Sequence, residues 1–192
     1  MRASPTPKPT NPFARFLDTP EPADLGPGPR AGVRPKDELH RELDPLLANT
    51  ILGQEHQHLI RALILLWHDH LDFAHRLAQD VPGPDGAFVH GIIHRREPDY
   101  SNAGYWFRRV GTHPALGTLA RAATAFAKGQ EARTLVSALV RANDWDPQAF
   151  INACAQAQAN ANPAQQELLR HIQRIESQVL LDFFVSGQAV TA

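Results

Sequence analysis

The sequence contains a single cysteine, Cys154, among its 192 residues, so no disulfide can form within the chain. It has no long apolar run either: the longest, Ala62 to Trp67, is far shorter than the ~20 residues that cross a bilayer. No charged-then-apolar secretory segment opens the chain. We therefore expect a cytoplasmic protein that does not insert into a membrane.

An excess of charge of either sign is also lacking. The chain has 19 Lys and Arg against 20 Asp and Glu, a formal net charge of -1. A general nucleic-acid surface is strongly basic, so no nucleic-acid partner is expected from overall charge. The length suits one domain, and the sequence carries no signal for an oligomeric state.

Large apolar residues are scarce in residues 1–35, which instead hold most of the chain's 16 prolines. Such a segment buries too little surface to offset its ordering entropy, so we expect a disordered or draped tail. Phe13, Phe16 and Leu17 form its one apolar group, which can dock on the domain or on a partner. Removing Met1 to Ala31 is expected to leave the fold intact.

Residues 36–192 read as one all-α domain, a bundle of about six to eight helices with no convincing strand. Two apolar stripes at helical spacing predict one long buried helix over residues 54–80. Asp146-Pro147 and Asn162-Pro163 each look like an N-cap followed by proline at the first helical position. The second of these opens a last helix over residues 163–185.

The stretch from Phe88 to Pro114 gathers residue types that a packing segment does not need. If residues 88–97 form a helix, His90 and His94 lie one turn apart on one face, with Glu97 beyond them, and two imidazoles and a carboxylate can share one ion. In a strand the two histidines would be ~13 Å apart. Asp85-Gly86 before the stretch and proline after it favour the helix. We predict a site for a divalent metal ion, zinc or similar.

The helix over residues 54–80 offers partners for that site, since an antiparallel neighbour joined by a short loop can meet it. His68, Asp72 and His75 fall in one narrow polar arc and are added to the candidate metal ligands. The alternative is a solvated or hydrogen-bonded helix edge. His70 falls in the apolar arc and is predicted to be buried and neutral, with a backbone carbonyl as its partner.

Arginines and aromatics follow the histidine pair. The arginines form two adjacent pairs, Arg95-Arg96 and Arg108-Arg109. One arginine of each pair can bind a carboxylate or phosphate in bidentate fashion, or can form a structural salt bridge to Glu97 or Asp99. Trp106 is expected to be core rather than a stacking platform. The candidate ligand-binding residues are Arg95, Arg96, Arg108, Arg109, Tyr105 and His113.

The strings HGIIHRREPDYSNAGYWFRRVGTHP, WHDHLDFAHRLAQD and DWDPQAF resemble a family of uncharacterised all-helical proteins of bacteria and fungi. The resemblance covers the chain from about Gln54 to its end and leaves out the proline-rich start. It implies a helical fold. That family has no established activity or cofactor, so the resemblance implies no function.

Three functions stay open. The first is a metal-dependent enzyme that acts on a small anionic substrate, with a free histidine or carboxylate as general base. The second is a non-catalytic binding module for a small anionic ligand or a protein segment, and the third is a metal-free structural network. No H-E-x-x-H motif fixes a metal or a reaction. Nucleophilic catalysis is disfavoured because Cys154 sits on an apolar helical face.

Overall fold

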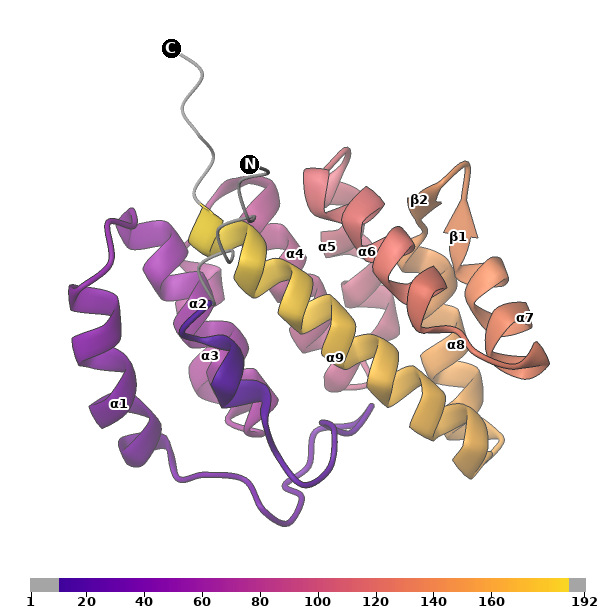
Figure 1. Ribbon diagram of the computed structural model, residues 1–192, viewed down its shortest axis with the longest axis horizontal. Helices are drawn as coiled ribbons and strands as arrows, with labels where there is room; N and C mark the ends of the chain where they lie inside the picture. Colours follow the sequence, from indigo (N-terminus) through magenta and orange to yellow (C-terminus); the bar gives the residue numbers. More distant parts are fainter. Residues whose placement is uncertain (1–10, 187–192) are drawn as a thin grey trace, which may run out of the picture.

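The computed structural model describes residues 11–186, which form nine α-helices, one 3-10 helix and one two-stranded hairpin (Figure 1). In order these are η1 (Ala14–Leu17), α1 (Lys36–Ala48), α2 (Gln54–Trp67), α3 (Leu71–Gln79), α4 (Gly83–Arg96), α5 (Tyr100–Val110), α6 (Pro114–Phe126), α7 (Gln130–Leu139), β1 (Val140–Arg141), β2 (Asp144–Trp145), α8 (Pro147–Ala159) and α9 (Pro163–Ser186). The all-α fold class is confirmed. The helix number exceeds the expected range by one because one predicted helix is divided.

The single helix predicted over residues 54–80 is wrong: it breaks between Trp67 and Leu71. Asp69 at the break has a left-handed backbone, with φ 64°. Its carboxylate is fully buried and accepts hydrogen bonds from the Arg30 backbone N–H at 2.9 Å and from Arg96 at 2.8 Å. An aspartate tolerates this conformation better than most residues, and the buried charge interactions outweigh the periodicity that favours one continuous helix.

The two predicted N-caps are confirmed. Asp146 accepts a hydrogen bond from the Ala149 N–H at 3.0 Å and opens α8, and Asn162 accepts one from Gln165 at 3.2 Å and opens α9. These side chains satisfy backbone donors that a helix leaves free in its first turn. Local chemistry alone therefore set these two boundaries.

The expectation of no strand is wrong for one short hairpin. Val140 pairs with Trp145 and Arg141 with Asp144, around Ala142 and Asn143, which both have positive φ. Two consecutive residues of this kind make the tight turn that matches strand twist. Two-residue strands are too short to show an alternating pattern, so periodicity could not reveal them.

Helix α9 spans the molecule and closes its core. Figure 1 shows it crossing from the α8 side to the α2 side, and it packs against α2, α6 and α8. Its buried face includes Leu169, Ile172, Leu180 and Phe184. Among the described residues, no helix combines the length and the apolar character that a membrane crossing requires.

Residues 11–35, which we call the strap, take the draped form of the two that were expected; residues 1–10 lie outside the described part. Phe13, Phe16 and Leu17 are at most 1 % exposed and belong to the same apolar core as the helices. The expectation that little apolar surface is lost with this segment is therefore wrong. The composition of the strap did not predict this docking, because burial of a few large side chains is enough to hold a proline-rich segment on the domain.

We predict that Phe16→Ala lowers the free energy of unfolding by about 3 kcal/mol, because it removes a fully buried aromatic side chain. Urea denaturation followed by circular dichroism measures the loss. Phe126→Ala is the matched control, since that ring is 37 % exposed on α6 and should lose much less. Equal losses in the two variants would show that the strap does not contribute to the core.

Candidate metal centre

Helix α4 carries two of the candidate ligands and is buried along most of its length. All residues from Gly86 to Arg96 are buried, so the helix lies inside the bundle rather than on its surface. Gly91 permits close packing, because a Cβ there would lie 2.8 Å from the Phe107 ring. The close neighbour of α4 at this point is thus α5. The expected helical form of residues 88–97 places His90 and His94 on successive turns.

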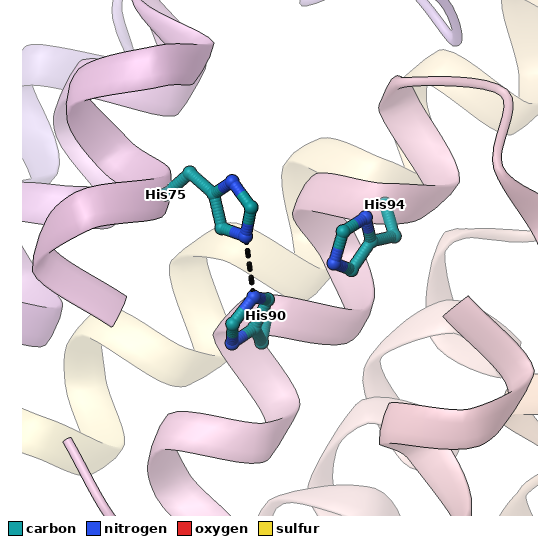
Figure 2. Close-up of side chains that lie close together, drawn as sticks. All are labelled: His75, His90 and His94. Carbon is teal, nitrogen blue, oxygen red and sulfur yellow. Dashed lines mark hydrogen bonds between the residues drawn. The ribbon is translucent and has the colours of Figure 1, made fainter. Parts of the chain in front are cut away.

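Three imidazoles meet at one place: His75 from α3, and His90 and His94 from α4 (Figure 2). Each offers one ring nitrogen, and these nitrogens all lie within 4.8 Å of one another. The His90 and His94 rings stack at 13°, while the His75 ring meets both of them edge-on, at 78° and 81°. This histidine cluster can hold a metal ion.

One nitrogen–nitrogen separation in the cluster, that between His75 and His90, is shorter than in a zinc site. The His75 and His90 Nε2 atoms are 2.6 Å apart. Two imidazole nitrogens on one tetrahedral zinc ion, at about 2.0 to 2.1 Å each, are about 3.3 Å apart. Binding an ion would separate this pair by less than about 1 Å, which small side-chain rotations provide.

Glu97 takes a supporting position and not the ligand position that the sequence suggested. Its Oε2 lies 2.9 Å from His94 Nδ1, on the side of the ring away from Nε2. A carboxylate there holds the proton on Nδ1 and leaves Nε2 as the lone-pair donor. The Asn102 amide nitrogen is 3.2 Å from Nε2 and 3.4 Å from Nδ1 of the same ring. A group nearly equidistant from both nitrogens lies over the ring face, so Nε2 keeps its lone pair.

Burial favours the neutral, metal-binding form of His90 and His94. His90 and His94 are 3 % and 6 % exposed. Burial, with the neighbouring His75, lowers the pKa of His90 to about 4. Burial also lowers the pKa of His94, although Glu97 acts in the opposite direction. Neutral imidazole is the form that binds metal, so the lowered pKa of these two rings favours metal binding near pH 7.

Trp106 of α5 covers the cluster on one side. Its ring stacks on His90 at a centroid distance of 4.0 Å and an angle of 9°. The Arg109 guanidinium lies 5.4 Å from the centre of the Trp106 ring and also contacts Tyr105. Trp106 is therefore a stacking partner of a candidate ligand, which the sequence did not predict. No local motif indicates this stacking; it depends on how α5 packs against α4.

The break after Trp67 separates the other histidines of this region from the cluster. His68 Nε2 donates to the Phe16 carbonyl at 2.9 Å, and its Nδ1 accepts from the Arg34 N–H, so both nitrogens hold the strap. His70 donates to the Arg34 carbonyl at 2.9 Å. It has the expected kind of partner but is half-buried rather than buried. Asp72 is exposed on α3 and does not join the cluster.

Arg95 and Arg96 are both buried, and each forms an ion pair with a carboxylate that is distant in the sequence. Arg95 binds Glu176 of α9 and lies over the Phe150 ring. Arg96 binds Asp69 and the Gly26 carbonyl of the strap. Neither is available to a ligand, and neither pairs with Glu97 or Asp99. Arg108 and Arg109 are exposed on α5.

His113 caps α6 and lies in a separate network. Its Nδ1 accepts from the Ala115 N–H, and its Nε2 donates to Asp85 at 2.8 Å. His56 reaches the other oxygen of Asp85 at 2.9 Å. Burial acts to raise the pKa of Asp85, but these two imidazoles outweigh it and lower the pKa. The structure thus places His113, a candidate ligand-binding residue from the sequence, at the start of α6.

Cys154 is buried in α8, and its burial raises the pKa of the thiol to about 12. A thiol that stays protonated is a poor nucleophile. This agrees with the sequence argument against cysteine catalysis.

Comparisons of the chain with protein-family models, with curated proteins and with solved structures find no match. The resemblance to helical proteins of bacteria and fungi therefore stays a prediction.

The buried position of His68 predicts a pH dependence of stability. Burial lowers its pKa from 6.5 to about 4, so the fold prefers the neutral ring. The stability that His68 contributes is therefore complete above about pH 6.5 and is lost as the pH falls towards 4. His68→Gln cannot titrate, so its stability should fall less over this range, by on the order of 2 kcal/mol. Urea denaturation between pH 7 and 4, with chelator present, measures the difference; parallel curves would contradict it.

Proposed function

We propose that the protein binds a divalent metal ion, zinc or similar, through His75, His90 and His94. The observation that carries the proposal is the convergence of three imidazoles from two helices. Two further features support it. Glu97 holds the Nδ1 of His94 as a carboxylate does behind a metal-ligating histidine, and the burial of the rings favours the form that binds metal.

A three-histidine set suggests a catalytic rather than a structural centre. Structural zinc sites are usually closed by four protein ligands, whereas catalytic sites keep one position for water or substrate. When bound, such an ion would polarise an oxygen of a substrate or lower the pKa of water. We therefore propose a metal-dependent enzyme, with a binding module for a small ligand as the non-catalytic version of the same site.

A metal-free histidine network is the second candidate. It is favoured by the 2.6 Å contact between His75 and His90, in which one Nε2–H donates to the other nitrogen. In that network His75 and His90 depend on each other, whereas His94 is held by Glu97, so the losses from removing His90 and His94 should roughly add.

We predict that zinc raises the melting temperature of the chelator-treated protein, because the ion binds the folded chain. His75→Ala, His90→Ala and His94→Ala should each remove nearly all of this shift, and His90→Ala combined with His94→Ala should add little. Ligands of one ion act as a unit, so their losses do not add. Metal analysis of protein purified without a histidine tag gives the bound metal directly.

His171→Ala is the control for this series, since His171 is a partly exposed histidine of α9 that pairs with Glu167. It should keep the full zinc shift. Additive losses that are the same with and without chelator would refute the metal site and favour the histidine network.

We predict that Glu97→Gln weakens zinc binding by about tenfold to a hundredfold, as expected when the carboxylate behind a ligating histidine is lost. Competition with a chromophoric chelator measures the affinity. Asp99→Asn is the matched control, because Asp99 is a nearby carboxylate that caps α5 instead. An unchanged affinity in Glu97→Gln would show that Glu97 does not support the centre.

A further inference from the structure

Most arginines of the described chain are held by carboxylates, but those on α5 beside the histidine cluster are not. Arg95 and Arg96 bind Glu176 and Asp69, and other arginines pair across the surface. Within residues 11–186, Arg108 and Arg109 have no carboxylate within ion-pair distance. An unpaired guanidinium next to a candidate metal centre is a natural partner for an anionic group of a ligand.

Arg109 is the one of this pair that aromatic contacts position. Its guanidinium lies 5.4 Å from the centre of the Trp106 ring and 5.7 Å from that of Tyr105, and one N–H points at the Tyr105 hydroxyl at 3.4 Å. Cation–π contacts of this kind fix the position of a charge that would otherwise move freely. Arg108 is displaced by about 100° around the helix and lacks these contacts.

Trp106 connects this guanidinium to the cluster. The Trp106 ring stacks on His90 at 4.0 Å, and His90 stacks on His94 at 5.0 Å. Pairwise contacts therefore connect His94 to His90, His90 to Trp106, and Trp106 to Arg109. The guanidinium is 5.4 Å from the centre of the Trp106 ring, which is 4.0 Å from the centre of the His90 ring. One small molecule can span the resulting separation between the guanidinium and a candidate metal ligand.

We infer that the site takes a short aliphatic dicarboxylate, one end at the metal and the other at Arg109. The inference rests on the proposed function, since it needs the ion. Carboxylate oxygens are good zinc ligands, which suits the open coordination position. At the far end, the guanidinium fork matches the two oxygens of a carboxylate, and the Tyr105 hydroxyl adds one donor.

The test uses full-length protein loaded with zinc and calorimetric titration with succinate, glutarate and butyrate. Butyrate has one carboxylate and serves as the matched ligand. The better of the two dicarboxylates should bind at least about tenfold more tightly than butyrate, as a charged hydrogen-bonded contact provides. Arg109→Gln should bring its affinity down to that of butyrate while leaving zinc affinity and butyrate binding unchanged. Arg108→Gln should retain the preference.

Several results would overturn the inference. An equal loss in Arg108→Gln would mean that net positive charge attracts the ligand without a defined contact. Equal binding of butyrate and both dicarboxylates by the wild-type protein would show that Arg109 does not bind the second carboxylate. An unchanged preference after zinc removal would show that the metal does not bind the first carboxylate. Protein that binds zinc but does not discriminate overturns this inference alone, whereas protein that binds no zinc overturns the proposed function as well.

Discussion

The buried carboxylate of Asp69 is the interaction on which the rest of the structure depends. It joins Arg30 of the strap to Arg96 of α4 at the point where the chain turns between α2 and α3. Removing it would leave two buried cations without their partner, a loss that typically costs about 3 to 5 kcal/mol. The strap is shaped around it: Gly28 approaches so closely that a Cβ would lie 2.7 Å from the Asp69 side chain.

This turn also decides which histidines meet. In one continuous helix, His68 and His75 would be seven residues apart and would lie on nearly the same face. The break at Asp69 leaves His68 at the end of α2, where it binds the strap, and starts α3 in a new direction that brings His75 to α4. A histidine cluster with one member from α3 is thus a consequence of a charge interaction outside the cluster.

Features set by neighbouring residues could be read from the sequence. The Asp146 and Asn162 caps and the one-turn spacing of His90 and His94 depend only on local geometry. Features set by distant partners could not. Arg95 cannot bind a ligand because it is paired with Glu176, which is distant in the sequence, and no residue near Arg95 indicates this pairing.

The strap shows the same limit in another form. Proline content describes how a segment behaves alone, whereas burial of Phe13 and Phe16 depends on sites that the helices provide. Trp106 is a similar case. Its position on a helix predicts a core residue, and its stacking on the His90 imidazole depends on a neighbour that the local sequence does not indicate.

The three imidazoles all belong to one helical hairpin, residues 75–94, with Glu97 just after it. Contacts between the three histidines therefore span few residues, and bringing them together requires only a short loop closure. The distant contacts of Arg95 and Arg96 hold the hairpin in the bundle but supply no ligand. The histidines and Glu97 thus come from α3, α4 and the residue after α4, whereas the aromatic and arginine side chains beside them come from α5. Substitutions on α5 can therefore change the surroundings of the cluster without replacing any of its three imidazoles.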